Sequence, residues 1–267
     1  MNSHSKSPNF FFMRDALRKQ LLRFKFSAWL IGLRRKFVTQ LKFKRQFVHF
    51  AKTCNRFPVQ WEERMPCLDD ATPNTGFDAH YIFHTSWAAR HVANHRPEVH
   101  IDISSSLYFS SIVSAFVPVS FYDYRPVSLG LSGLESKRGD LMALPFDDKS
   151  VLSLSCMHVV EHVGLGRYGE PLDPDGDIHA MRELKRVLAP GGTLLFVVPV
   201  GRSRIMFNAH RIYFIEQIIA EFSGLTLIEF SLIPDFPRLE IVLNASHDLA
   251  NSQEYGCGCF RFTRPLE

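Results

Sequence analysis

The sequence lacks any long apolar run. Its best run, residues 26–33, is only eight residues long and is interrupted by Ser27 and Gly32. A membrane-spanning helix needs about 20 apolar residues, so none is expected here. Lys and Arg flank the run and no small-residue cleavage site follows it, so a removed signal peptide is not expected either.

Cysteine is scarce and odd in number. The five cysteines are Cys54, Cys67, Cys156, Cys257 and Cys259. An odd, sparse set fits a reducing compartment better than a disulfide framework, which predicts a cytoplasmic protein. Internal repeats and long low-complexity tracts are also missing. With 267 residues, 46% of them hydrophobic, the chain can form one α/β domain with an appendage.

Acidic residues are almost missing from the first 60 residues. This segment holds 14 Lys and Arg against the single acid Asp15, whereas the rest of the chain holds 17 bases and 26 acids. Prolines and glycine interrupt any periodicity between residues 58 and 78, where the sign of the charge changes. We therefore predict a basic helical extension over 1–60, a linker over 61–78 and an α/β domain over 79–267.

The basic extension has apolar residues at helical spacing, with cations between them. Two such series are Leu17, Leu21, Phe24, Ala28, Ile31 and Phe26, Leu30, Leu33, Phe37, Leu41. One interpretation is an amphipathic helix over residues 10–50 that lies on an anionic membrane, at the inner face of the cytoplasmic membrane. The alternative is a helix that packs on its own domain or on a second subunit. Nucleic acid is an unlikely partner because no nucleic-acid motif accompanies the charge.

From residue 79 onward, strand and helix patterns alternate. The predicted helices are 80–94, 107–116, one through 178–188, and 213–222; the predicted strands are 99–103, 119–122, 151–156, 193–198, 225–232 and an edge strand 258–263. Strands separated by helices pair in parallel through right-handed crossovers. The sequence therefore predicts an open, doubly wound, mostly parallel α/β sheet.

Polar residues follow the predicted strands, where such sheets bind ligands. Asp102 and residues 104–106, all serine, follow the first strand, and Asp123 ends the second. Asp123 lies 21 residues beyond Asp102, about the distance at which nucleotide-binding units place an acid for the ribose hydroxyls. Gly139-Asp140-Leu141 and residues 157–162 lie in later loops of the same kind.

Several motifs resemble the class I S-adenosylmethionine-dependent methyltransferases. They are Gly139-Asp140, Leu144-Pro145-Phe146, Asp148, Ser150, His158-Val159-Val160-Glu161-His162, Glu183, Arg186-Val187-Leu188, Pro190-Gly191-Gly192, and Asn208, His210 and Tyr213. Their order and spacing match, and the likeness covers residues 80–263. Within this superfamily the chain is similar to a bacterial branch often met beside surface-polysaccharide genes.

The resemblance implies a cofactor and residue roles. The cofactor would be S-adenosylmethionine, with Asp102, Ser104 and Ser106 under its methionine part. Asp123 would hold the ribose diol, and Asp140 with Leu141 the adenine edge. The acceptor side would consist of His158, Glu161, His162 and Arg167. His162 is the favoured base because histidine titrates near neutrality, but it could equally hold its loop by a hydrogen bond.

The first loop departs from the family pattern. Serines 104–106 stand where the family has glycines, and each Cβ takes space near the ligand, while non-glycine residues tolerate positive φ poorly. The loop could give an altered cofactor geometry or mark a retired site. Two functions follow: a methyltransferase of a small-molecule or glycan acceptor in surface-polysaccharide biosynthesis, or a non-catalytic scaffold attached peripherally to the membrane.

Two further patterns have competing interpretations. His158-x-x-Glu161-His162 matches the inverted zincin motif, but it starts near a strand end and precedes Gly164 and Gly166, which disfavours the helix that zinc binding requires. No metal is therefore expected. Asp177 is the expected N-cap of the helix from 178. A final cluster of cations could hold a phosphate or an acidic sugar: Arg202, Arg204 and Arg211.

Overall fold

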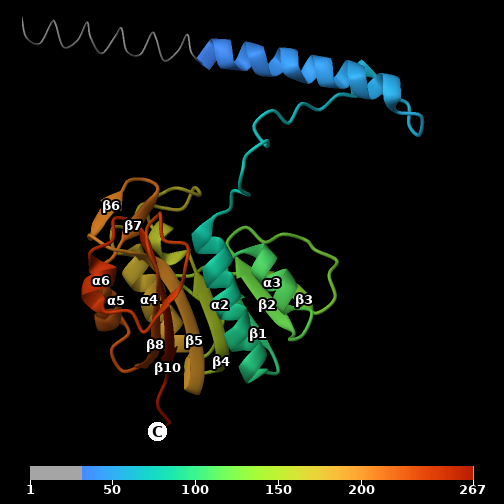
Figure 1. Ribbon diagram of the computed structural model, residues 1–267. Helices are drawn as coiled ribbons and strands as arrows, with labels where there is room; N and C mark the ends of the chain where they lie inside the picture. Colours follow the sequence, from blue (N-terminus) through green and yellow to red (C-terminus); the bar gives the residue numbers. More distant parts are fainter. Residues whose placement is uncertain (1–31, 267) are drawn as a thin grey trace, which may run out of the picture. The chain divides into compact units, whose positions relative to one another are not determined.

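The computed structural model describes residues 32–266 and divides the chain into two compact units, residues 1–76 and 77–267 (Figure 1). In the first unit, residues 32–53 are helical and a short 3-10 helix, η1, spans Trp61–Glu63. The Phe43 and Phe47 rings contact Trp61, with centroids 6.2 and 4.9 Å apart. Of the two apolar series predicted for the basic helix, Leu33, Phe37 and Leu41 are described. The members before residue 32 lie outside the described residues.

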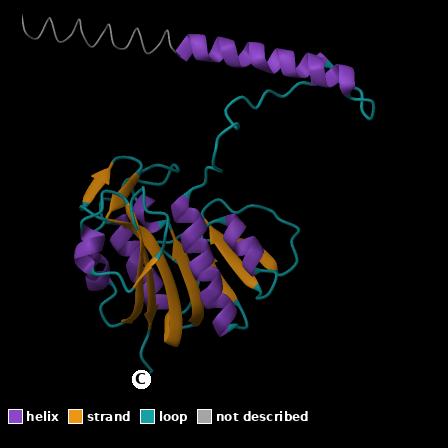
Figure 2. Cartoon of the chain, in the orientation of Figure 1, coloured by secondary structure: helices purple, strands orange, loops and turns teal. Residues whose placement is uncertain are grey.

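The second unit is an α/β domain. Its elements are α2 (Ala79–His95), β1 (His100–Ile103), α3 (Leu107–Val113), β2 (Val119–Asp123), β3 (Leu134–Arg138), β4 (Val151–Met157), η2 (Val160–His162), α4 (Gly176–Val187), β5 (Leu188–Val200), β6 (Arg204–Met206), β7 (His210–Ile212), α5 (Ile215–Glu221), β8 (Thr226–Ile233), β9 (Val242–Leu243), α6 (His247–Asn251) and β10 (Gly256–Thr263). Helices cover both faces of the central sheet (Figure 2).

The main sheet has eight strands in the order β3-β2-β1-β4-β5-β10-β8-β9. β3, β2, β1, β4 and β5 pair in parallel, whereas β10 is antiparallel to both β5 and β8. This confirms the predicted open, mostly parallel α/β fold. The expectation that residues 258–263 form an edge strand is wrong: β10 lies inside the sheet, with Phe260 paired to Phe196 and Phe230.

Alternating side chains of β5 divide the core between two layers. Leu194, Phe196 and Val198 join the cluster that contains α4 and α5, whereas Leu195 and Val197 join the cluster that contains α2 and α3. Residues on both faces are buried, which explains why β5 reads as a continuous apolar run. β10 follows the same rule: Cys257 and Cys259 face the α2 layer, and Phe260 and Phe262 face the opposite layer.

Candidate functional site

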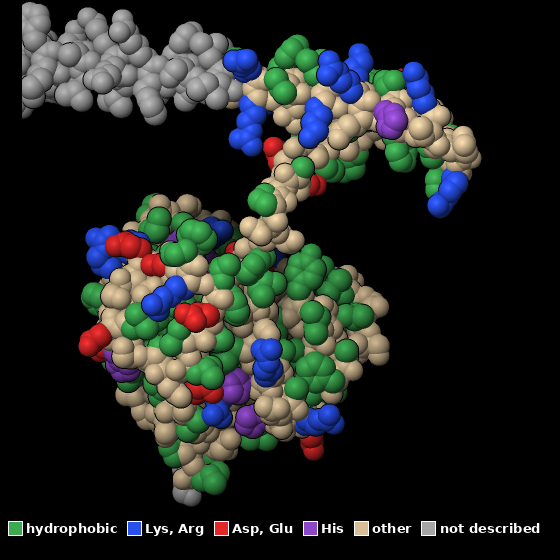
Figure 3. Space-filling model, in the orientation of Figure 1, with side chains coloured by type: hydrophobic (Ala, Val, Ile, Leu, Met, Phe, Trp, Pro, Cys, Tyr) green, Lys and Arg blue, Asp and Glu red, His purple; other side chains and the backbone are tan. Residues whose placement is uncertain are grey.

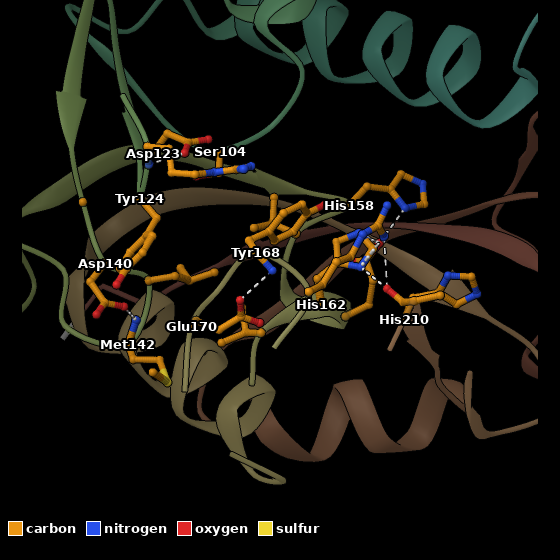
Figure 4. Close-up of a pocket in the computed structure, with 18 of the residues that line it drawn as sticks. Ser104, Asp123, Tyr124, Asp140, Met142, His158, His162, Tyr168, Glu170 and His210 are labelled. Carbon is orange, nitrogen blue, oxygen red and sulfur yellow. Dashed lines mark hydrogen bonds and ion pairs between the residues drawn. The ribbon is translucent and has the colours of Figure 1, made fainter. Parts of the chain in front are cut away.

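A cavity of about 710 Å³ lies at the carboxyl ends of β1, β2, β3 and β4. This volume falls within the roughly 300–1,000 Å³ of small-molecule sites. The start of α2 and the residue before β10 complete its wall. The lining residues include Asp78, His80, Tyr81, Ser104, Asp123, Asp140, Leu141, His158, Glu161, His162, Arg167, Tyr168, Glu170, His210 and Tyr255 (Figure 4).

The carboxylates of Asp123 and Asp140 mark one end of the cavity. Asp123 ends β2, and its Oδ1 accepts a hydrogen bond of 2.7 Å from the Arg125 amide. Asp140 Oδ1 accepts one of 2.9 Å from the Met142 amide. Leu141 adds an apolar wall and is buried. The structure thus brings Asp123, Asp140 and Leu141 to one cavity. There the two carboxylates, which accept hydrogen bonds, lie near the apolar Leu141 side chain.

The serine loop leaves this cavity open. Ser104 adopts φ +53°, the left-handed conformation that glycine favours, and its hydroxyl donates to the Tyr122 carbonyl at 2.9 Å. The Ser105 hydroxyl accepts from the Met157 amide at 3.0 Å. Ser106 is the N-cap residue of α3, and only Ser104 of residues 104–108 lines the cavity. The hydroxyl groups of Ser104 and Ser105 therefore form hydrogen bonds within the fold, and the expected positions of Ser106 and its hydroxyl at a ligand are not supported, because Ser106 does not line the cavity.

Asp102 does not reach the cavity. It is fully buried on β1, where its carboxylate accepts hydrogen bonds from the hydroxyls of Ser155, at 2.6 Å, and of Ser110. Burial raises the pKa of Asp102 to about 6, although its serine donors oppose the shift. Asp102 thus stabilises the layer beneath the serine loop. Its expected contact with the methionine part of a cofactor has no support in this geometry.

Ionisation of Asp102 should weaken the fold. A carboxyl whose folded pKa is raised from 3.8 to about 6 contributes stability below 3.8 and loses it as the pH rises to about 6. We expect the free energy of unfolding of Asp102→Asn, relative to wild type, to increase by about 2–3 kcal/mol between pH 4 and 7. Urea denaturation at each pH measures this difference.

The free energy of unfolding of Asp102→Asn must be compared with that of the wild type at each pH, because His100 changes stability with pH in the opposite direction. Burial lowers the pKa of His100 to about 4, so this group costs stability as the pH falls from 6.5. The two contributions offset each other in the wild type. Asp147→Asn, at an exposed carboxylate, is the matched control. A pH-independent difference for Asp102→Asn would refute this assignment.

Glu161 lies at the centre of the other end of the cavity. Its side chain is 1% exposed, and Oε1 lies 2.9 Å from His158 Nδ1 and 3.8 Å from His162 Nε2. Oε2 has no hydrogen-bond partner among the described residues. A buried carboxylate oxygen without a donor is costly, so a ligand hydroxyl or amine that donates to it would be favoured.

His162 is fixed by its second ring nitrogen. Nδ1 lies 2.6 Å from the Ala209 carbonyl oxygen, which makes Nδ1 the protonated nitrogen and leaves the lone pair on Nε2. Arg167 donates to the same carbonyl at 3.1 Å. The two sequence-based interpretations of His162 are therefore compatible: the ring holds the loop through Nδ1, and Nε2 is able to take a proton within the cavity wall.

Several lining residues were not predicted from the sequence. Asp78, His80 and Tyr81 lie at the start of α2, and Tyr255 immediately precedes β10. Tyr124, Arg125 and Met142 lie in the loops after β2 and β3. The helical pattern of 80–94 indicates only which face is buried, and its first turn carries no motif. Partial burial, reinforced by His158, lowers the pKa of His80 to about 4, so the ring is neutral at physiological pH.

Two predictions about charged residues are wrong. Arg211 is buried and forms an ion pair of 3.3 Å with Asp177, so it is not available for a phosphate. Arg202 and Arg204 both pair with the exposed Glu254, and for these two the phosphate site stays a prediction. Asp177 lies within α4, whose N-cap is Asp175, and accepts a hydrogen bond from the Tyr213 hydroxyl.

The inverted zincin motif lacks the α-helix that it requires, as its sequence context indicates. Residues 160–162 form the short 3-10 helix η2.

Comparison with known proteins supports the fold. Residues 148–236 match a family model described as "Caenorhabditis protein of unknown function, DUF268". None of the curated proteins matches the chain. The structure resembles the [4+2]-cyclase SpnF, with 14% identity and a TM-score of 0.50 over 68% of this chain and 81% of that one.

Two methyltransferase structures are also similar. A putative sarcosine dimethylglycine methyltransferase from Galdieria sulphuraria has 14% identity and a TM-score of 0.50, with 69% of this chain and 86% of that one covered. The N-methyltransferase NodS from Bradyrhizobium japonicum WM9, in complex with S-adenosyl-l-homocysteine, has 18% identity and a TM-score of 0.49 over 85% and 98%. The chain has the Rossmann-like fold of the class I methyltransferases.

Proposed function

We propose that this chain is an S-adenosylmethionine-dependent methyltransferase whose acceptor is the hydroxyl group of a small molecule or a glycan. The observation that carries the proposal is Asp123 at the carboxyl end of β2, facing a cavity that the serine loop leaves open. Fold alone cannot decide the reaction, since one similar structure is a cyclase and another a putative methyltransferase. The residues in the cavity must decide it.

The cofactor end of the cavity fits an adenosine group. Asp123 would accept hydrogen bonds from the two ribose hydroxyls, each contributing about 1.5–3 kcal/mol when charge-assisted. Asp140 and Leu141 would flank the adenine. Gly139 permits close packing there, because a Cβ at this position would lie 3.0 Å from Tyr122 Cβ. When bound, S-adenosylmethionine supplies a methyl group on a positively charged sulfur.

The acceptor end of the cavity can position a hydroxyl group and take its proton. An acceptor hydroxyl that takes up this methyl group would give its proton to His162 Nε2. The buried Glu161 carboxylate, 3.8 Å away, would stabilise the resulting imidazolium. Arg167 holds the loop through the Ala209 carbonyl. The function of these residues is to align the acceptor and to exclude water.

A glycan acceptor is favoured by the aromatic side chains of this end. The rings of Tyr81, Tyr168 and Tyr255 line the cavity, together with Glu161 and His162. Apolar ring faces beside a few polar groups suit a ligand with both C–H and hydroxyl surfaces. A role in surface-polysaccharide biosynthesis is part of this proposal.

Calorimetry with S-adenosylmethionine tests the proposed function. We expect the full-length protein to bind one equivalent with micromolar affinity, because the cavity is open and the Asp123 and Asp140 carboxylates line it. S-adenosylhomocysteine should compete for the same site. If neither compound binds at millimolar concentration, the domain is instead a non-catalytic scaffold that retains the fold.

The helix of residues 32–53 supports a second part of the proposal, attachment to an anionic membrane surface. It carries seven Lys and Arg and no acid, and Phe37, Leu41 and Phe50 are exposed among them. Blue cationic and green apolar side chains alternate along it (Figure 3). None of the helices in residues 32–266 is long and apolar enough to cross a bilayer. Surface binding is therefore the form of attachment that we propose.

Flotation with liposomes tests this attachment. Replacing Arg34, Arg35 and Lys36 with Gln should weaken binding to anionic vesicles by about a hundredfold, because each cation contributes about 1 kcal/mol. A matched control replaces exposed cations of the α/β domain, Lys137, Arg182 and Arg202, and should bind as the wild type does. The proposal would be excluded if the protein floated equally with neutral and anionic vesicles, or if it floated with neither.

A further inference from the structure

Three metal-binding side chains converge at the rim of the sheet. His80 is the second residue of α2, His158 follows β4, and Cys257 is the second residue of β10. One potential ligand atom from each lies within 4.8 Å of the other two. Their elements are far apart in sequence, but the amino end of α2, the carboxyl end of β4 and the amino end of the antiparallel β10 meet at one edge of the sheet. The topology therefore creates the cluster.

One of the distances fits tetrahedral zinc. Zn–N bonds of about 2.0–2.1 Å and Zn–S bonds of about 2.3 Å place neighbouring ligand atoms about 3.3–3.6 Å apart. Cys257 Sγ lies 3.4 Å from His158 Nε2, which matches this range. The His80 ring stacks on the His158 ring, with centroids 5.5 Å apart and planes 10° apart, so His80 would have to turn toward the ion to become the third ligand.

His158 is already oriented as a metal ligand. Its Nδ1 lies 2.9 Å from Glu161 Oε1, which fixes the proton on Nδ1 and turns the Nε2 lone pair toward Cys257. A carboxylate that holds the outer nitrogen of a ligating histidine is the usual support of zinc sites. His158 also adopts φ +57°, a left-handed conformation that is uncommon for this residue type.

Several carboxylates act on the cluster. Asp78 and Asp235 act electrostatically on His80, and Asp78 and Glu161 act on Cys257. Asp78 also accepts a hydrogen bond from the Tyr81 amide, which offsets the positive amino end of α2. The adjoining His84 is fully buried, and its Nε2 has no partner among the described residues. These polar groups gather on a cluster that contains no cationic side chain.

We propose that His80, His158 and Cys257 bind one Zn²⁺ ion, with the fourth coordination position open toward the cavity. This site shares only His158 with the inverted zincin motif, and His162 is not a ligand. Binding deprotonates the Cys257 thiol and releases the proton to solvent, since thiolate is the ligating form. His80 and His158 line the cavity, so the open position faces it. The proposal does not depend on methyl transfer.

Metal titration of the full-length protein tests this site. After treatment with a chelator, the wild type should bind one equivalent of Zn²⁺, and Co²⁺ in its place should give a thiolate-to-cobalt charge-transfer band. Cys257→Ser should abolish that band, and His80→Gln should lower the affinity for Zn²⁺ at least tenfold. Glu161→Gln should lower it by about 10–100-fold through loss of support for His158.

Cys156→Ser is the matched control, because Cys156 is equally buried, in strand β4, and lies outside the cluster. It should bind metal as the wild type does. If Cys257→Ser fails to fold, His80→Gln decides, since His80 is only partly buried. Absence of stoichiometric Zn²⁺ uptake by the wild type, or unchanged affinity in His80→Gln, would overturn the proposal. Either result would leave the cofactor proposal to its own test.

Discussion

Asp123→Ala should weaken the binding of S-adenosylmethionine by about 100- to 10,000-fold. Two charge-assisted hydrogen bonds to the ribose diol contribute about 3–6 kcal/mol together, and each 1.4 kcal/mol corresponds to a factor of ten. The carboxylate ends β2 at the cavity wall, and we propose that it accepts both hydroxyls. Calorimetry with the purified variant measures the loss directly.

Two controls separate ligand binding from loop structure. Asp123 Oδ1 also accepts the Arg125 amide hydrogen, so alanine removes a turn contact together with the charge. Asp123→Asn keeps that contact and removes only the charge, so it should retain part of the affinity. Asp147→Ala, at an exposed position outside the cavity, should bind as the wild type does. Equal affinity in wild type and Asp123→Ala would contradict the assignment of the ribose site.

Arg211→Ala should lower the free energy of unfolding by about 3–5 kcal/mol. The Arg211 and Asp177 side chains are 5% and 6% exposed, and their ion pair measures 3.3 Å. Removing the arginine leaves a buried carboxylate without its cation, which is among the most destabilising single changes. It also frees the Val163 carbonyl, which accepts from Arg211 at 2.6 Å. Thermal unfolding should shift downward by about 6–20 °C.

The double variant Arg211→Met with Asp177→Leu is the informative comparison. Replacing both members of a buried pair by apolar residues of similar size costs less than removing one. We therefore expect it to be more stable than Arg211→Ala. Arg204→Ala, which breaks a pair with the exposed Glu254, should change stability by less than about 1 kcal/mol. If Arg211→Ala lost no more stability than Arg204→Ala, the ion pair between Arg211 and Asp177 would not stabilise the fold.

The strands and helices of the sheet core could be predicted from the sequence because their patterns report local burial. β5 reads as a continuous apolar run since both of its faces are covered. β3, with the sequence Leu-Glu-Ser-Lys-Arg, was missed because it is an edge strand with one buried residue. The internal position of β10 could not be predicted, because strand order depends on contacts between distant segments and Gly256 and Gly258 look like edge or turn residues.

The candidate site was predictable where it follows strands and unpredictable where it does not. Asp123, Asp140 and the segment from His158 to His162 were located by the rule that ligands bind at carboxyl ends. Asp102 obeys the same rule but points into the core, a direction set by strand register. His80 and Tyr255 reach the cavity from outside this rule. Only the fold shows that the start of α2 and the start of β10 share that edge.

Crystals grown with S-adenosylhomocysteine would show whether this cavity holds an adenosine group. We expect density at the carboxyl ends of β1, β2 and β4, with the ribose hydroxyls on the Asp123 carboxylate and the adenine beside Leu141. Density elsewhere, or an unaltered cavity at saturating ligand, would contradict this expectation.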